Sequence, residues 1–256
     1  MELLQMSSQS TIDAAEVARF SAIAAEWWEA KGKFAPLHAM NPARLSYLRA
    51  RACAHFFPGD VAREASMQPL AGLRVLDIGC GGGLMAEPLA RLGAEIVAID
   101  AAPTNISVAS LHAEEMGLRI DYRATTAEAL AAGDDAGRFD LVLALEIIEH
   151  VADVALFYDS VAKLVRPGGM VMLSTLNRTP KSYAMGIIGA EYLLRWLPRG
   201  THQWKRFVKP SEMARALRER GLRVADMAGI TYQPLKRQFA VDPTDLQVNY
   251  MLSAVA

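Results

Sequence analysis

The first feature suited to chemistry is a run of glycines that follows a short β-rich segment. Residues 74–78 form that segment, and residues 79–83 read Gly-Cys-Gly-Gly-Gly. Glycines let a backbone turn sharply and approach a ligand closely, because no Cβ intervenes. Asp77 precedes the run, and Asp100 ends a second β-rich segment 23 residues later. A carboxylate at Asp100 can accept two hydrogen bonds from a ribose diol, so the pattern predicts a nucleoside site.

Three interpretations of this loop compete. Residues 81–86 also fit the G-x-G-x-x-A pattern of dinucleotide sites, which is weak evidence alone, and an ordinary tight turn needs no ligand. A carboxylate at Asp77 is poorly placed for a pyrophosphate but suits the cationic amino group of a methionine moiety. The D-x-G-x-G-x-G run resembles that of class I methyltransferases that use S-adenosylmethionine (AdoMet). We therefore expect Asp77, Gly79, Gly81 and Asp100 to contact AdoMet.

A second group of polar residues directly follows the apolar segment 139–144 and comprises Glu146, Glu149 and His150. If residues 146–150 form a helical turn, the three side chains share one face. His150 or Glu149 would then act as a general base toward a substrate hydroxyl. Alternatively, the three side chains would hold a divalent cation, and carboxylates favour Mg²⁺ over zinc. A solvated helix start, with Glu facing the helix dipole, is the third alternative.

The elements that must position these residues alternate regularly. Helical patterns of 10 to 15 residues separate β-rich segments at 74–78, 95–100, 119–123, 139–144 and 170–175. This alternation predicts an α/β fold with a doubly wound, mostly parallel sheet, whose ligands lie at the carboxyl ends of the strands. A helix at 211–220 precedes two further β-rich segments, 223–232 and 246–255, which are close enough in sequence to pair antiparallel.

The first 60 residues have a helical pattern without a strand signal. Asp13 can cap a helix that runs through Trp27, and Pro42 suits the first turn of a second helix. We therefore expect an N-terminal helical cap over 1–60 and an AdoMet-binding domain over 61–256.

Composition excludes several classes of protein. The chain has 256 residues, of which 52% are hydrophobic, and a formal net charge of −1. This content excludes a disordered chain, and the charge excludes a globally basic nucleic-acid binder, so we expect no nucleic-acid partner. Cys53 and Cys80 are too few for a disulfide framework. With neither a spanning apolar run nor a basic leader, the chain is expected in the bacterial cytoplasm.

Short runs spread over the chain resemble the ubiquinone-biosynthesis O-methyltransferase family. The most specific are Ser174-Thr-Leu-Asn177-Arg178, Gly189-Ala-Glu-Tyr192 and Asn249-Tyr250-Met251. Others are Trp27-Trp28, Asn41-Pro42-x-Arg44-Leu45, Pro167-Gly-Gly and Gly200-Thr-His202. The resemblance implies a class I methyltransferase fold and AdoMet-dependent methylation of ring hydroxyls on 2-polyprenyl-6-hydroxyphenol and 3-demethylubiquinol. Another phenolic or catechol acceptor, a nicotinamide oxidoreductase and a non-catalytic AdoMet-binding partner are the alternatives.

The resemblance also implies roles for individual residues. AdoMet contacts are implied at Arg44, Gly79, Asp100 and Leu145, and Leu145 departs mildly from the family's usual Met. By analogy with the wider superfamily, Thr126 and Ala127 lie where adenine is contacted. Related eukaryotic members link the Glu-x-x-Glu-His residues to magnesium, which implies Mg²⁺ at these sites: Glu146, Glu149 and His150. Trp27 and Trp28 either roof the site or serve only packing.

The stretch 180–210 interrupts the alternation and is expected to be a lid insertion. It carries six basic side chains against one acid, Glu191. Its apolar part is too short and too charged to span a bilayer but suits an amphipathic helix at an anionic membrane surface. We therefore expect peripheral association with the inner face of the membrane. The resemblance further implies a complex with other ubiquinone-biosynthesis enzymes as a partner. An ordinary lid or dimer helix is the alternative.

Overall fold

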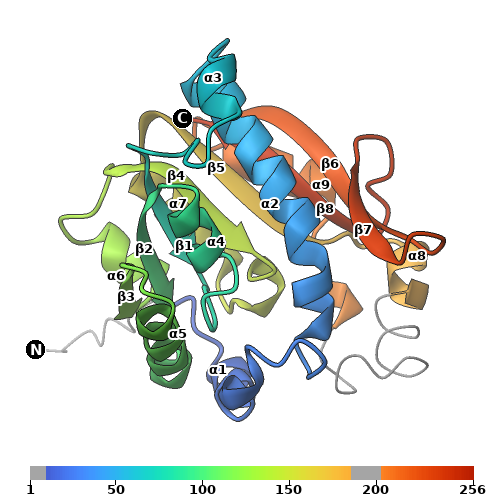
Figure 1. Cartoon of the computed structure of the whole chain (residues 1–256). Helices are drawn as coiled ribbons and strands as arrows, with labels where there is room; N and C mark the ends of the chain where they lie inside the picture. The colour runs from blue at the N-terminus through green and yellow to red at the C-terminus, as the bar shows by residue number, and fades with distance from the viewer. Residues whose placement is uncertain (1–9, 186–202) are drawn as a thin grey trace, which may run out of the picture.

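An eight-stranded sheet forms the centre of the molecule (Figure 1), and the computed structural model describes residues 10–185 and 203–256. The strand order is β3-β2-β1-β4-β5-β8-β6-β7. The strands are β1 Arg74–Ile78, β2 Glu95–Asp100, β3 Asp121–Ala124, β4 Phe139–Leu145, β5 Val165–Leu176, β6 Arg223–Gln233, β7 Gln238–Asp242 and β8 Asn249–Val255. Strands β1 to β5 are parallel, whereas β8 is antiparallel to both β5 and β6, and β7 is antiparallel to β6.

Helices cover both faces of this sheet. They are α1 Ala14–Ser21, α2 Ala35–Phe56, α3 Val61–Glu64, α4 Ala86–Arg91, α5 Pro103–Glu115, α6 Ala127–Ala131, α7 Val154–Leu164, α8 Pro180–Ser182 and α9 Pro210–Arg218, with 3-10 turns η1 Ala24–Glu26, η2 Ile148–His150 and η4 Trp204–Arg206. Phe157 of α7 and Leu217 of α9 join one apolar cluster, and Leu48 of α2 and Leu89 of α4 join a second. Because both faces are covered, the central parallel strands are almost wholly buried, as in β4, where residues 141–144 are inaccessible to solvent.

The sequence pattern predicted the sheet well. The five parallel strands, the final helix and the antiparallel pairing of the last two predicted segments are all confirmed. Strand β8, however, lies between β5 and β6 rather than at the edge. The strand at the edge is β7, a short strand that was not predicted. Tyr232 of β6 and Phe239 of β7 are partners across this hairpin, and their ring centroids are 5.2 Å apart.

The N-terminal helices differ from the prediction. Asp13 does cap α1, accepting hydrogen bonds from the N–H groups of Ala15 and Glu16, but α1 ends at Ser21 and does not continue through Trp27. Helix α2 begins at Ala35, so Pro36 occupies its first turn and Pro42 lies inside the helix. The expected start at Pro42 is therefore wrong. Pro36 also fits a first helical turn, where a missing N–H costs nothing.

Helix α2 crosses the sheet, and α1 lies beyond the strand ends (Figure 1). Tyr47 and Leu48 of α2 pack in the same apolar cluster as the sheet. The proposed boundary near residue 60 stays a prediction. Most of the predicted 180–210 insertion falls outside the described residues. Within the described ranges, no helix is long and apolar enough to cross a membrane.

Candidate active site

A cavity of about 680 Å³ lies at the carboxyl edge of the sheet. Polar residues from the ends of β1, β2 and β3 line one side, among them Asp77, Asp100 and Thr126. Glu146 and His150, which follow β4, also line it. Since β4 lies between β1 and β5 in the sheet, these two residues stand near the middle of the edge.

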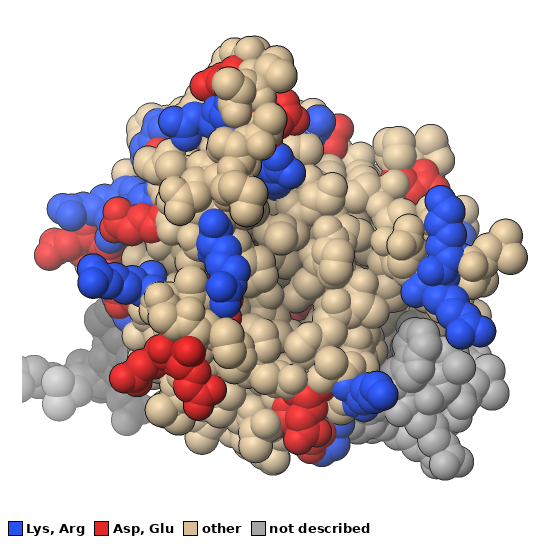
Figure 2. Space-filling view, viewed as in Figure 1, with Lys and Arg blue, Asp and Glu red and all other residues tan. Residues whose placement is uncertain are grey.

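The other side of the cavity is apolar. Its lining residues come from β6, β7, the start of β8 and helix α2, and they include Ile230, Tyr232, Phe239, Val248, Leu37 and Met40. In Figure 2 the middle of the face crossed by α2 is largely uncharged, and charged side chains stand mainly around it. The order of the strands thus divides the lining of this one cavity into two parts, and Glu146 and His150 follow the strand that lies between them. We call the part lined from β1, β2 and β3 the polar chamber and the part lined from β6, β7, β8 and α2 the apolar chamber.

The glycine loop after β1 turns through left-handed backbone conformations. Gly79, Gly81 and Gly83 have φ angles of 72°, 55° and 87°, which only glycine adopts without strain. The loop is also boxed in by protein: a Cβ on Gly82 would lie 2.4 Å from the Cβ of Trp27, and one on Gly79 would lie 2.8 Å from Ile147 Cδ1. The glycines therefore admit these neighbouring side chains as well as a ligand.

Asp100 is fixed by three donors at the end of β2. Its Oδ1 accepts hydrogen bonds from the N–H of Ala102 at 2.8 Å and from Asn105 Nδ2 at 3.1 Å, and its Oδ2 accepts one from the N–H of Gly81 at 3.0 Å. Burial raises the pKa of Asp100, although these bonds oppose the shift. The carboxylate lines the cavity in a fixed orientation, as a ribose acceptor must.

Asp77 differs from Asp100 because one of its two carboxylate oxygens has no donor in the described part of the chain. It is 3% exposed, and its Oδ2 has no hydrogen-bond partner among the described residues. Burial, followed by the nearby charge of Asp100, raises the pKa of Asp77 to about 7. A buried carboxylate on a cavity wall without a cation is a poor arrangement alone but a good one for a cationic ligand. This orphaned oxygen fits the amino group of AdoMet.

Arg44 reaches the cavity from α2 and is paired within the protein. Its guanidinium is buried, and Nη2 lies 2.8 Å from Glu146 Oε1. That oxygen also accepts hydrogen bonds from Ser174 Oγ at 2.7 Å and Asn249 Nδ2 at 2.9 Å. Glu146 holds a left-handed φ of 56°, a strained conformation for a residue with a side chain. The strained turn places the Glu146 carboxylate beside Arg44.

The expected shared face of Glu146, Glu149 and His150 is wrong. Only residues 148–150 are helical, as a 3-10 turn, and Glu146 lies outside that turn. Glu149 is buried, does not line the cavity, and accepts a hydrogen bond from Thr175 Oγ1 at 2.7 Å. His150 does line the cavity, and its Nδ1 lies 2.8 Å from Glu16 Oε2 of α1. The three side chains therefore turn to three different partners.

This arrangement does not suit a metal ion. Among residues 10–185 and 203–256, no group of three His, Cys, Asp or Glu side chains is placed to hold one. Glu146 is neutralised by Arg44, and Glu149 lies on another side of the turn from the cavity. The residues present do not fit Mg²⁺ in the implied site.

The remaining predicted contacts surround the polar chamber. Leu145, Thr126 and Ala127 all line the cavity, and Thr126 caps α6 through a hydrogen bond from the N–H of Ala129. Trp27 also lines it, stacks on Phe34 at 3.6 Å and donates to Asn105 Oδ1 at 2.9 Å. Trp27 thus both roofs the glycine loop and serves packing.

Trp28 does not line the cavity and instead packs outside it against the glycine loop. Its ring stacks on His112 at 3.5 Å, and its Nε1 donates to the carbonyl of Gly82 at 3.0 Å.

Four residues of the site were missed by sequence reasoning. They are Glu16, Asn105, Ser174 and Asn249, each of which holds a predicted site residue through a hydrogen bond. Ser174 and Asn249 begin two of the specific runs quoted above, so a signal was present. Glu16 and Asn105 lie at ordinary helical positions, and no local pattern marks them.

Comparison with known proteins agrees with this geometry. A family model described as a methyltransferase domain matches residues 44–226. The ubiquinone biosynthesis O-methyltransferase of Azorhizobium caulinodans is 53% identical over 250 residues, covering 97% of this chain and 96% of the relative. The ubiquinone biosynthesis O-methyltransferase of Chelativorans sp. is 54% identical over 246 residues, which cover 96% of this chain and 94% of the relative. The chain belongs to the ubiquinone biosynthesis O-methyltransferase family.

Solved structures show the same fold at low sequence identity. A methyltransferase from Thermotoga maritima, described as a possible histamine N-methyltransferase, has a TM-score of 0.60 at 16% identity and covers 94% of this chain and 99% of its own. Magnesium protoporphyrin IX methyltransferase from Synechocystis, solved with bound S-adenosylmethionine, has a TM-score of 0.59 at 17% identity and covers 97% and 99%. The predicted class I methyltransferase fold is confirmed, and this member of the family is an AdoMet-dependent methyltransferase.

Proposed function

We propose that this methyltransferase transfers a methyl group to ring hydroxyls of polyprenylated phenols and quinols in ubiquinone biosynthesis. The acceptors are 2-polyprenyl-6-hydroxyphenol and 3-demethylubiquinol. The observation that carries the proposal is the cavity, which places the orphaned carboxylate of Asp77 in a polar chamber that opens into an apolar one. The named relatives support the pathway.

The polar chamber would hold the cofactor. Bound AdoMet supplies an electrophilic methyl group on a sulfonium, and the electron pair of the broken C–S bond stays on sulfur. Asp77 would hold its amino group, Asp100 its ribose, and Thr126 with Ala127 the adenine. Arg44 would meet its carboxylate while sharing the guanidinium with Glu146, since an arginine offers five donors.

The apolar chamber would hold the acceptor ring and the start of its tail. The hydroxyl would face His150, which lies between the chambers and would take the hydroxyl proton as general base. A free phenol has a pKa near 10, so removal of the proton makes the oxygen a far better nucleophile. Orientation of the two reactants supplies most of the acceleration. Because Mg²⁺ does not fit the implied residues, the proposal assigns removal of the hydroxyl proton to His150.

We also propose contact with an anionic membrane surface through residues 180–210. The described start of this stretch supports it: Lys181, Ala184 and Met185 border the cavity, and the Tyr183 and Met185 side chains are exposed. A polyprenyl tail would then pass from bilayer to cavity without crossing water. Partnership with other enzymes of the pathway would follow from a shared membrane surface.

Incubation with labelled AdoMet and a prenylated catechol tests the catalytic proposal. We expect a methyl ether to form without added metal, and we expect EDTA to leave the rate of its formation unchanged. Loss of activity with EDTA that returns with Mg²⁺ would show that a metal takes part. Turnover of a catechol without a prenyl tail at equal efficiency would favour a different phenolic acceptor.

Sedimentation with liposomes tests the membrane contact. The protein should bind vesicles that contain phosphatidylglycerol at low salt and dissociate as ionic strength rises, because basic residues contribute about 1 kcal/mol each at such a surface. Neutral phosphatidylcholine vesicles are the control. Equal binding to both vesicles, or to neither, would contradict a contact based on charge.

A further inference from the structure

Helix α1 brings a carboxylate to the imidazole of His150. Glu16 Oε2 lies 2.8 Å from His150 Nδ1, and the two residues are 134 positions apart in the chain. Their side chains are only 15% and 10% exposed. Burial alone would raise the pKa of Glu16, but the hydrogen bond and charge of His150, together with the charge of Arg19, outweigh burial and lower that pKa. The pair is therefore a protected tertiary contact, with the acid in its charged form.

A second contact from the same helix orients the ring. Phe20 packs edge-on against the His150 imidazole, with ring centroids 5.4 Å apart and planes at 86°. One turn of α1 thus supplies both the polar partner of Nδ1 and an apolar wall for the ring. The orientation of His150 depends on how α1 is docked.

The docking of α1 is itself specified by polar contacts on two sides. Thr11, just before the helix, donates through its N–H and Oγ1 to the carboxylate of Glu128 at 2.9 and 2.7 Å. The Thr11 carbonyl accepts from the N–H of Ala152 at 2.9 Å, two residues after His150. Asp13 pairs with Arg206 at 3.0 Å. These contacts fix the position of α1, and with it Glu16, beside His150.

We propose that Glu16 is a positioning residue for methyl transfer, which fixes the orientation and the tautomer of His150. A carboxylate acceptor at Nδ1 keeps the hydrogen of the neutral imidazole on that nitrogen, so the lone pair resides on Nε2. The hydroxyl proton of the acceptor would move to Nε2, and the charge of Glu16 would stabilise the imidazolium until the proton leaves to solvent. This inference rests on the proposed role of His150 as the base.

Steady-state kinetics of variants test the inference. We expect Glu16→Ala to lower kcat roughly 10- to 100-fold, in the range for partners that orient a proton-transferring histidine, with the Kd of AdoMet within about threefold. Glu16→Gln keeps an acceptor oxygen but removes the charge, so its kcat should fall less than that of Glu16→Ala. Arg19→Gln is the matched control, because it removes the 2.5 Å Arg19–Glu16 pair on the same helix and leaves Glu16 beside His150. It should keep kcat within about twofold.

A double-mutant cycle separates positioning from simple structural support. In a His150→Ala background, Glu16→Ala should have almost no further effect on kcat, because the group it orients is gone. If the full loss persists in that background, Glu16 acts by another route and the inference is overturned. A kcat for Glu16→Ala within twofold of wild type overturns it as well.

Proton NMR provides a readout that needs no acceptor. The Nδ1 proton of His150, assigned by its absence in His150→Ala, should resonate downfield in the wild type and shift upfield in Glu16→Ala. An unchanged shift would overturn the inference. If His150→Ala keeps full kcat while the NMR shift behaves as expected, the base assignment under the proposed function fails and the contact remains structural. If His150→Ala is impaired and Glu16→Ala is not, only the positioning role fails.

Discussion

Asp77 is a carboxylate that is buried without a neighbouring cation in the described part of the chain, so we expect its charge to serve ligand binding. Asp77→Asn keeps the shape of the side chain and removes the charge. We expect at least tenfold weaker binding of S-adenosylhomocysteine at pH 8, since a charge-assisted hydrogen bond contributes roughly 1.5–3 kcal/mol. Isothermal titration calorimetry measures this. Unchanged affinity would show that the amino group is held elsewhere.

The raised pKa of Asp77 also determines the sign of a pH effect on stability. In the folded, ligand-free protein this carboxyl keeps its proton up to about pH 7, whereas its ordinary pKa is 3.8. Its contribution to stability is complete below pH 3.8 and is lost as the pH rises through 7.

Asp77→Asn cannot ionise and should therefore be more stable than wild type at pH 8 without ligand, by on the order of 1–4 kcal/mol. The difference in free energy of unfolding between Asp77→Asn and wild type should become smaller as the pH falls toward 5. Thermal unfolding at the two pH values checks this. A variant less stable than wild type at pH 8 would contradict it.

At the residue scale, sequence patterns predicted which side chains lie at the site better than they predicted which of them lie together. Asp77 and Asp100 were predicted because each ends a strand, and strand ends meet at one edge. Glu146, Glu149 and His150 were grouped on one face on the assumption that residues 146–150 form a regular helical turn. The left-handed φ of Glu146 breaks that turn, and no residue type in the segment signals it. Glu16 was missed because its partner is 134 residues away.

At the scale of elements, the glycine loop at residues 79–83 packs against the segment that contains Trp27 and Trp28. Gly82 has no left-handed φ, so Gly82→Ala should act only through its Cβ, which would lie 2.4 Å from Trp27. Overpacking of this kind costs about 1–3 kcal/mol, and we expect that loss in the free energy of unfolding. Urea denaturation measures it.

Gly133→Ala is the control for this substitution, because its Cβ would meet nothing nearer than 3.6 Å. Trp27→Gly removes the Cβ as well as the ring and should relieve the clash, so the double variant Trp27→Gly/Gly82→Ala should be more stable than the two separate losses predict. Strict additivity would show that Trp27 is not what the new methyl group meets.

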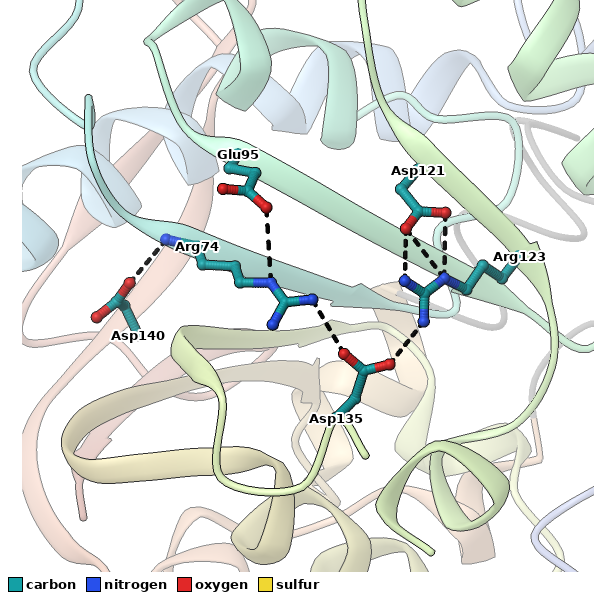
Figure 3. A network of polar contacts seen from close by, with 6 residues as sticks. All are labelled: Arg74, Glu95, Asp121, Arg123, Asp135 and Asp140. Atoms are coloured by element: carbon teal, nitrogen blue, oxygen red, sulfur yellow. Dashed lines mark hydrogen bonds and ion pairs between the residues drawn. The ribbon is translucent and has the colours of Figure 1, made fainter. Parts of the chain in front are cut away.

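An ion-pair network joins the starts of the strands at the edge opposite the cavity (Figure 3). Asp135 accepts from Arg74 at 3.0 Å and from Arg123 at 2.6 Å, and so ties β1 to β3. Burial raises the pKa of Asp135, but the two guanidiniums outweigh burial and hold that pKa below its ordinary value. The contribution of Asp135 to the stability of the fold is therefore present at neutral pH and is lost as the pH falls through this lowered pKa.

Asp135→Ala should reduce the free energy of unfolding by about 1–2 kcal/mol at pH 7, with a smaller loss at high salt, because the network is partly exposed. Its kcat should stay unchanged, since none of the six residues of the network (Figure 3) lines the cavity. Denaturation and activity assays check the two parts. Asp134→Ala, an exposed neighbour, is the control. A matching fall in kcat would contradict the separation of the two edges.

At the element scale, periodicity predicted the alternating strands and helices but not where α2 begins. Pro36 and Pro42 are both compatible with a first helical turn, and the choice between them is made by packing. Met40, Arg44 and Leu48 lie on one side of α2, and the sheet and the cavity accept that side. A local pattern does not contain this information.

For the whole molecule, ligand binding and stability are linked. At 100 times its Kd, S-adenosylhomocysteine should stabilise the protein by about 2.7 kcal/mol, which corresponds to roughly 5–10 °C in Tm for a chain of this size. NADH at the same concentration should give no shift, because Asp77 opposes a pyrophosphate. Thermal-shift measurements compare the two. A larger shift with NADH would overturn the cofactor assignment.

The position of β8 has a consequence for how the chain is made. This last strand fills the gap between β5 and β6, and the N–H of Ala256 donates to the carbonyl of Gly169 at 3.0 Å. On the ribosome, β6 and β7 emerge before the strand that connects them to β5. The newborn chain must therefore carry two unpaired strand edges, those of β5 and β6, until residues 249–255 have left the exit tunnel.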